Sequence, residues 1–178
     1  MRHQVGCPKL FIMLPAVRRI RSDEAEVLRA VRLAALEESP SAFGSSFAAE
    51  VTQPRVDWAR RALLGAQGVD QVTYFAVVEG DVVGLGGGYR PDPNGTEVEL
   101  VSMWTSPRAR RSGVGRGLVS AVIEWAREVG ATHLCLWVTR GNEPAQRLYE
   151  SMGFHETGDY QPLPSDPCKD ETRMALAL

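Results

Sequence analysis

The sequence predicts an α/β (α+β) fold with one mixed, mostly antiparallel central sheet of about six to seven strands and helices on both faces. Two patterns carry this prediction. In the first half, segments rich in β-branched and aromatic residues are joined by a tight turn, which is typical of an antiparallel meander. In the second half, strands alternate with helices, which is typical of βαβ units. The length of 178 residues fits a single domain.

The first elements are a predicted strand and two helices. Residues 16–21 read as a strand, after which Asp23 and Glu26 form a D-x-x-E capping pattern. The helix that follows has apolar residues at helical spacing and ends near Ser39 and Pro40. A polar and aromatic connection, 41–52, leads to a second helix that Pro54 opens.

Three strands and then a second helical unit follow. Segments 72–78 and 82–89 form a hairpin around the turn 79–81, and after the loop 90–96 a strand spans 97–105. A helix is predicted over 113–129, ended by Gly130. The strand 132–139 is apolar enough to be buried on both faces, and a short helix spans 143–152. The last strands are 154–160 and 173–178, which leaves 161–171 as a loop.

Charge and cysteine content exclude several classes of protein. The 20 basic and 22 acidic residues give a formal charge of −2, which argues against a nucleic-acid-binding protein. The longest apolar runs fall short of the ~18–20 residues that a membrane span needs, and the start lacks a secretory apolar core. The three cysteines (Cys7, Cys135, Cys168) and three histidines are scattered, so we expect free thiols, a cytoplasmic protein and no metal site.

The most specific local feature is the glycine-rich segment 110–117, which lies between a predicted strand and a predicted helix. It reads R-R-S-G-V-G-R-G. Free amides at a helix start, glycines that allow close approach and nearby arginines suit a pyrophosphate. A P-loop would need a Lys and a Ser or Thr that are missing, and a Rossmann turn would need G-x-G-x-x-G spacing. The remaining alternative is a helix start whose glycines serve only packing.

Two motifs together resemble the GNAT family of acetyl-CoA-dependent N-acetyltransferases. Arg110, Gly113 and Gly115 match its R/Q-x-x-G-x-G/A signature. A second family pattern, N-x-x-A-x-x-L-Y-x-x-x-G-F, is matched by Asn142, Ala145, Leu148, Tyr149, Gly153 and Phe154. The resemblance is specific over 97–160. It implies one GNAT domain over 15–178, with 1–14 as an irregular N-terminal extension.

The resemblance also implies how the cofactor is held. In this family the pyrophosphate of coenzyme A lies on the amides of the glycine-rich turn, and the pantetheine arm pairs with the strand before it, where a bulge opens a slot for the thioester. The matching cofactor-binding residues here are Met103, Trp104, Thr105, Arg110, Arg111, Ser112, Gly113, Val114, Gly115, Arg116 and Gly117, together with Asn142. Asn142 could instead serve as a plain helix N-cap.

Two residues match catalytic positions of relatives. Tyr149 matches a tyrosine that protonates the departing thiolate, and its alternative role is that of a core aromatic. Glu99 matches a general base on the strand before the turn, with Glu97 as a second candidate, although both could be polar residues at a solvated strand end. Cys135 lies between leucines in a predicted buried strand and reads as a core thiol.

The expected function is direct transfer of an acetyl group from acetyl-CoA to a primary amine of a small molecule. The alternatives are a protein N-terminal or lysine acetyltransferase and, from another class, a non-catalytic acyl-CoA sensor. Acidic residues near the C-terminus favour a cationic acceptor: Asp159, Asp166, Asp170 and Glu171. We expect no nucleic acid, membrane or metal partner, and relatives are often homodimers.

Overall fold

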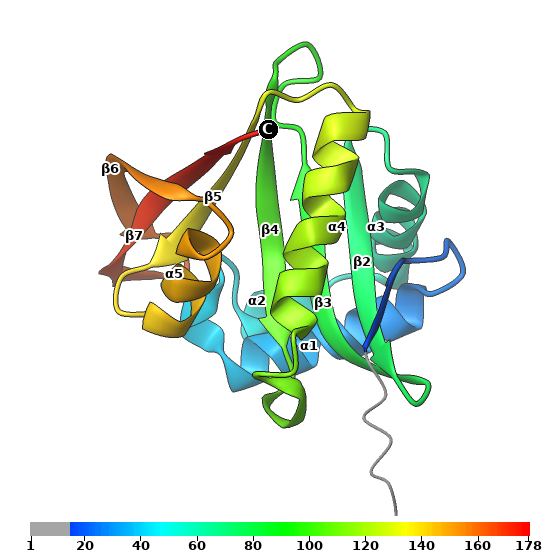
Figure 1. Cartoon of the computed structure of the whole chain (residues 1–178). Helices are drawn as coiled ribbons and strands as arrows, with labels where there is room; N and C mark the ends of the chain where they lie inside the picture. Colours follow the sequence, from blue (N-terminus) through cyan, green and yellow to red (C-terminus); the bar gives the residue numbers. More distant parts are fainter. Residues whose placement is uncertain (1–14) are drawn as a thin grey trace, which may run out of the picture.

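A seven-stranded sheet with the strand order β1-β2-β3-β4-β5-β7-β6 runs through residues 15–178, which are the residues that the computed structural model describes (Figure 1). The strands are β1 (Ala16–Arg19), β2 (Gln71–Val78), β3 (Asp81–Tyr89), β4 (Glu97–Thr105), β5 (His133–Thr139), β6 (His155–Leu163) and β7 (Asp166–Ala177). All neighbouring strands are antiparallel except β4 and β5. The predicted fold class is confirmed, whereas the predicted extension 1–14 lies outside the described residues.

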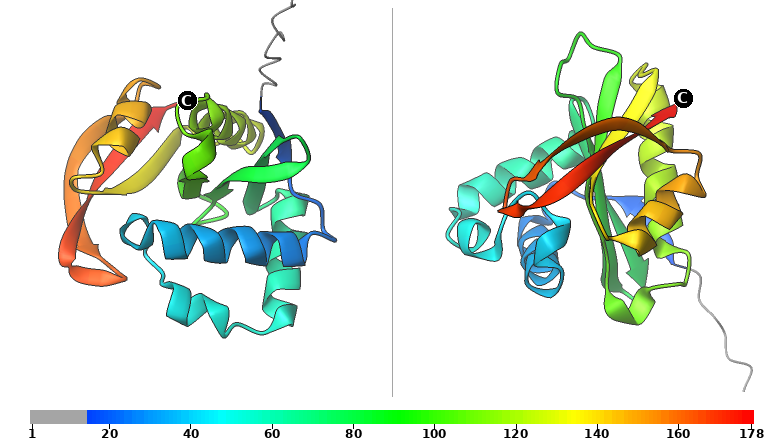
Figure 2. Two further views of the ribbon diagram at one scale, coloured as in Figure 1. Left: turned by 90° about the horizontal axis from the view of Figure 1, so that it is seen from below. Right: turned by 90° about the vertical axis from the view of Figure 1, so that its left-hand side faces the viewer.

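Helices cover both faces of the sheet (Figures 1 and 2). They are α1 (Ala25–Glu38), α2 (Phe47–Val51), α3 (Arg55–Gln67), α4 (Val114–Glu128) and α5 (Glu143–Glu150). Helix α4 packs on β2, β3 and β4, and its buried residues join Leu100 and Leu136 in the largest apolar cluster. On the other face, α1 and α3 bury Leu28 and Trp58 against Phe75. The sheet is therefore the shared wall between two apolar cores.

Glycines in β3 bring α4 close to the sheet. A Cβ atom on Gly88 would lie 2.3 Å from the ring of Trp125, and one on Gly84 would lie 2.7 Å from Val114. The absence of side chains at these two positions lets the start and the middle of α4 contact the strand. The position of the glycine-rich turn, which immediately precedes α4, follows from this close packing.

The predicted capping pattern at Asp23 and Glu26 is wrong. Helix α1 starts at Ala25 with Glu24 at its N-cap, and no side chain caps it. The Glu24 carboxylate instead accepts hydrogen bonds from Arg18 at 2.7 and 2.8 Å and from the Arg21 amide at 2.8 Å. These bonds, those from Arg18 first, lower the pKa of Glu24 to about 2. A part-buried ion pair to Arg18 of β1 therefore anchors the start of the helix.

Two segments predicted as irregular are regular. The connection 41–52 contains α2, whose first turn is capped by the Ser46 hydroxyl. The predicted loop 161–171 belongs to a long hairpin, because β6 extends to Leu163 and β7 already starts at Asp166. Most of β6 is exposed at the edge of the sheet, so its residues show no apolar alternation that sequence reasoning could use.

Candidate active site

Strands β4 and β5 diverge within the sheet (Figure 1). Their parallel pairing covers only Glu97–Glu99 of β4 and ends at Cys135 of β5. Just beyond, β4 carries a bulge: Val101 pairs with Gly87 and Trp104 with Leu85, so Ser102 and Met103 together face Gly86. Ser102 adopts a left-handed conformation with φ 58°. The bulge bends β4 away from β5, as the resemblance implied.

A cavity of about 390 Å³ lies where the two strands diverge. Residues of β4 and β5 form its walls, while Asn142 and Tyr149 from the α5 segment lie on one side. Arg32 of α1, the loop 42–45 and the hairpin residues Gln161 and Glu171 also line it. Groups that are far apart in the sequence therefore meet in one cavity that lies at a gap in the sheet.

Tyr149 is one of the two predicted catalytic residues in this cavity. It is buried and its ring packs against Phe154, with centroids 5.8 Å apart. Burial raises the pKa of the Tyr149 phenol above its ordinary value of about 10. The raised pKa keeps the phenol protonated at neutral pH. Its hydroxyl makes no hydrogen bond within residues 15–178, so its proton is available to a group in the cavity.

Glu99, the other predicted catalytic residue, is half-buried on β4 and also lines the cavity. Burial raises its pKa, the negative charge of Glu97 adds to the effect, and the positive charge of Arg173 opposes it. The Glu97 carboxylate already has a partner, since it forms an ion pair with Arg173. Glu97 does not line the cavity, so the structure favours Glu99 over Glu97 as the carboxylate that a substrate could reach.

The glycine-rich turn forms the start of α4. Gly113 is the N-cap with φ 89° and Arg111 has φ 64°, and Ser112 closes the turn by donating to the Ala109 carbonyl at 2.6 Å. The first intrahelical bond is donated by Gly117 to Gly113. The amides of Gly113, Val114, Gly115 and Arg116 therefore have no intrahelical acceptor and are directed away from the helix start. Such a set of free amides forms a cradle that can hold an anion.

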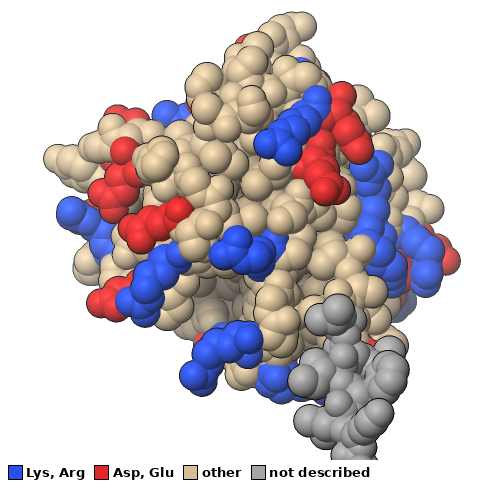
Figure 3. All heavy atoms as spheres, viewed as in Figure 1, with Lys and Arg blue, Asp and Glu red and all other residues tan. Residues whose placement is uncertain are grey.

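Basic side chains surround this cradle. Arg108, Arg110, Arg111 and Arg116 are all exposed. Figure 3 shows Lys and Arg side chains on several sides of a hollow between the start of α4 and α5. A Cβ atom on Gly115 would lie only 3.0 Å from Leu148, which shows how closely α4 approaches α5 at this point. Arg116 reinforces the approach by donating to the Ser151 hydroxyl at 2.7 Å.

Two predicted cofactor-binding residues make contacts to α1. Arg110 pairs with Glu38 at 2.6 Å and donates to the Thr105 carbonyl at 3.2 Å. The Trp104 indole donates to the same Glu38 at 3.1 Å. Met103 lines the cavity, and Asn142 both lines it and caps α5 by accepting from the Ala145 amide. The two roles considered for Asn142 are thus compatible.

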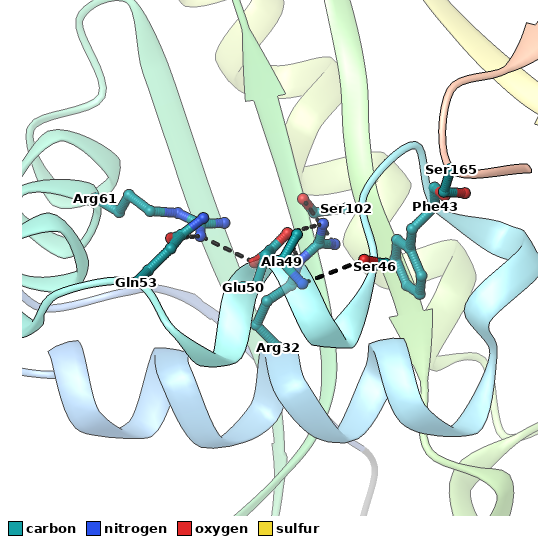
Figure 4. Close-up of polar contacts among 9 residues, drawn as sticks. All are labelled: Arg32, Phe43, Ser46, Ala49, Glu50, Gln53, Arg61, Ser102 and Ser165. Atoms are coloured by element: carbon teal, nitrogen blue, oxygen red, sulfur yellow. Dashed lines mark hydrogen bonds and ion pairs between the residues drawn. The ribbon is translucent and has the colours of Figure 1, made fainter.

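Sequence reasoning did not identify a buried charge network behind the bulge (Figure 4). Arg32 is paired in a forked geometry with Glu50 of α2, at 2.7 Å for the shortest contact, and Arg61 of α3 pairs with the same carboxylate at 3.0 Å. The Arg32 guanidinium lies over the Phe43 ring and reaches the Ser102 hydroxyl at 3.5 Å. Burial acts to raise the pKa of Glu50, but the two arginines outweigh it, so this pKa lies below its ordinary value.

A signal for Arg32 was present in the sequence. It lies midway between Leu28 and Leu36 on the buried side of α1, where an apolar residue is expected. A charged residue in such a stripe needs a partner, but nothing in the sequence names Glu50 as that partner.

Within residues 15–178, no group of three or more His, Cys, Asp or Glu side chains is arranged to hold a metal ion. In the same part of the chain, no helix is long and apolar enough to span a membrane.

The family model for the acetyltransferase (GNAT) family matches residues 32–154. The chain belongs to the GNAT family. The match includes α4, α5 and the β4–β5 gap, and it confirms the resemblance that the two sequence motifs indicated.

Individual GNAT proteins resemble different parts of the chain. It is 37% identical over 94 residues to a streptothricin acetyltransferase from Streptomyces lavendulae, which covers 51% of this chain but only 49% of that protein. It is 26% identical over 149 residues to a ribosomal protein bS18-alanine N-acetyltransferase from Haemophilus ducreyi, covering 76% of this chain and 94% of that one. The chain thus matches about half the length of the first relative and nearly all of the second.

A solved structure supports the fold. The putative acetyltransferase yncA from Salmonella typhimurium, solved with its cofactor acetyl-CoA, superposes with a TM-score of 0.73 at 20% identity. The superposition covers 92% of this chain and 94% of that chain. At 20% identity this superposition shows that the two proteins share the fold, and nothing more.

The charge network behind the bulge leads to a stability prediction. We expect Glu50→Ala to lower the free energy of unfolding by about 3–5 kcal/mol, because it leaves Arg32 buried without a partner. Chemical denaturation measures this change. The control is Glu26→Ala, which breaks the exposed pair with Arg55 and is expected to cost at most about 1 kcal/mol. Equal costs for the two variants would show that the buried network does not stabilise the fold.

Proposed function

We propose that this GNAT protein transfers the acetyl group of acetyl-CoA directly to a primary amine of a small molecule. The observation that carries the proposal is the cavity at the gap between β4 and β5, with a protonated phenol and a half-buried carboxylate on its walls and an anion cradle at the start of α4. Acyl transfer from a coenzyme A thioester to an amine can use all three parts: an anchor for the cofactor phosphates, a proton donor and a proton acceptor.

The binding part of the proposal uses the chain's backbone. The free amides of residues 113–116 and the exposed arginines around them would hold the pyrophosphate of acetyl-CoA. The β4 backbone over Met103, Trp104 and Thr105 no longer pairs with β5, so its polar groups can bond the pantetheine arm as an added strand would. The bulge amides near Ser102 could then polarise the thioester carbonyl.

The chemical part assigns one proton to each catalytic residue. Glu99 accepts a proton from the ammonium form of the acceptor, so that a neutral nitrogen attacks the thioester carbonyl. A bond forms between nitrogen and the acetyl carbon, and the bond between that carbon and sulfur breaks. Tyr149 donates its proton to the departing thiolate, and the second proton that the nitrogen loses as the amide forms returns to the Tyr149 phenolate, directly or through water. Most of the rate would come from holding the two substrates together in the cavity.

Cys135 supports direct transfer rather than an acyl-cysteine route. Burial, with contributions from Glu97, raises the pKa of its thiol to about 11. The thiol therefore stays protonated at neutral pH, and a protonated thiol is a poor nucleophile. Cys135 acts as a packing residue in this proposal.

A second candidate acceptor is the N-terminal amine of a protein. The similarity to the bS18-alanine acetyltransferase extends over 94% of that enzyme's length, which favours this alternative.

Coenzyme A release from acetyl-CoA, measured against a panel of small amines and short peptides, separates the two acceptors. Direct transfer predicts intersecting initial-rate plots. If acetyl-CoA binds but no amine in either group releases coenzyme A, the enzymatic proposal fails in favour of an acyl-CoA sensor.

The role of Tyr149 can be separated from its packing. Tyr149→Phe keeps the ring and its contact with Phe154 but removes the hydroxyl, so kcat should fall about 10²–10⁴-fold. Acetyl-CoA affinity by calorimetry and the melting temperature should change little. Normal turnover with a lowered melting temperature would instead make Tyr149 a core aromatic only.

The raised pKa of Glu99 predicts a specific pH dependence. A general base works only when ionised, so wild-type activity should fall as the pH drops through the Glu99 pKa, at a higher pH than for an ordinary glutamate of pKa about 4.3. Glu99→Gln should lower kcat/KM above this pKa and remove the fall that Glu99 causes below it, because the amide mimics the protonated carboxyl at every pH. Glu156→Gln, an exposed carboxylate on β6, is the matched control and should keep the wild-type profile. An unchanged profile in Glu99→Gln would assign proton removal to water.

A further inference from the structure

Glu171 is a carboxylate in the cavity to which the proposed mechanism gives no role. It lies on β7, in register with Thr139 of β5 on one side and Gln161 of β6 on the other. Only 6% of the residue is exposed, and its side chain lines the same cavity as Glu99. It therefore belongs to the wall formed by the β6–β7 hairpin.

Glu171 has no cationic partner within residues 15–178. One of its oxygens accepts a hydrogen bond from the Gln161 amide at 3.2 Å, and it forms no ion pair there. Nearby carboxylates are paired: Glu97 with Arg173, Glu50 with Arg32 and Arg61, and Asp170 with Arg140 at 3.9 Å. Burial raises the pKa of Glu171, and the Gln161 bond opposes this only in part. A buried carboxylate in this condition is stabilised when a cation arrives.

None of the other described charges around the cavity neutralises the Glu171 carboxylate. Arg32 is the cationic residue that lines the cavity, and its guanidinium is already engaged with Glu50. Glu99 likewise forms no ion pair among the described residues and has a raised pKa. Two further arginines do not line the cavity and are already paired, Arg61 with Glu50 and Arg173 with Glu97. The cavity therefore offers two unpaired carboxylates and one neutralised cation.

We infer that the acceptor is a diamine or polyamine, with one nitrogen acetylated next to Glu99 and a second cationic nitrogen held by Glu171. This inference rests on the proposed function and specifies its substrate class. Glu99 of β4 lies alongside Cys135, and Glu171 of β7 lies alongside Thr139 on the other side of β5. The two positions are therefore about 13 Å apart along β5 and two strand spacings, about 10 Å, apart across it. Both residues line the shared cavity, and carboxylates that extend into it shorten that span. An extended chain with a nitrogen at each end fits this arrangement.

The test compares amines of equal length that differ by one terminal charge. Initial rates are measured with pentylamine and 1,5-diaminopentane, and with octylamine and 1,8-diaminooctane. For the wild type, kcat/KM should be at least about tenfold higher for the diamine of the better pair, since a buried charge-assisted bond is gained. Glu171→Gln should reduce this ratio about tenfold, mainly through KM, whereas Glu156→Gln should retain it. A ratio that survives in Glu171→Gln, or no diamine preference in the wild type, overturns the inference.

A second variant gives a readout that a merely structural role would not move. Glu171→Asp keeps the charge but withdraws it by one methylene group. Across a series of diamines from three to ten carbons, its preferred length should move toward longer chains relative to the wild type. An unchanged optimum would contradict a direct contact between Glu171 and the second nitrogen.

Failure of this inference is distinguishable from failure of the proposed function. If acetyl-CoA binds but no amine is acetylated, the transferase proposal fails, and calorimetric titration with 1,8-diaminooctane alone decides the inference. Binding to the wild type that weakens about tenfold in Glu171→Gln supports a diamine site. Equal binding to both proteins, or none to the wild type, rejects it.

Discussion

Because β4 and β5 pair over only three residues, the sheet opens in its middle without losing either of its two halves. The left-handed conformation of Ser102 and the extra residue in β4 impose this opening, and each half is then held by its own apolar core. The unpaired backbone of β4 and the cavity beside it are consequences of the same bend. Tyr149 and Glu99 line the same cavity because β4 and β5 separate at this point.

The surroundings of the opening are held by charge as well as by packing. Arg32 connects α1, α2 and the bulge through Glu50 and Ser102. Glu38 connects α1 to Trp104 of β4 and to Arg110 in the segment after it. The same committed ion pairs leave Glu99 and Glu171 as the carboxylates that a ligand can neutralise. The electrostatics of the cavity are thus set by which pairs the scaffold has already formed, and this connects the stability of the fold to the choice of acceptor.

Features encoded by contiguous residues were predictable, and features that depend on long-range pairing were not. The strand Glu97–Thr105 was predicted with its observed bounds, and α4 to within one residue at either end, because strand patterning and the glycine-rich turn are local signals. The strands of the hairpin β6–β7 were predicted too short, with 161–171 as a loop, because its edge strand is polar and exposed. The capping role of Asp23 failed because Glu24 bonds to β1, and the pairing of Arg32 with Glu50, 18 residues away, has no local signature.

A crystal structure of the protein with acetyl-CoA tests the central claim most directly. The account predicts the pyrophosphate on the amides of residues 113–116, the pantetheine arm beside β4 at Met103–Thr105, and the thioester in the gap between β4 and β5. The Tyr149 hydroxyl should then lie within hydrogen-bonding distance of the sulfur, about 3–4 Å, and Glu99 on the other side of the acetyl group. A cofactor bound elsewhere, or a thioester that leaves the gap empty and Tyr149 out of reach, would contradict the account.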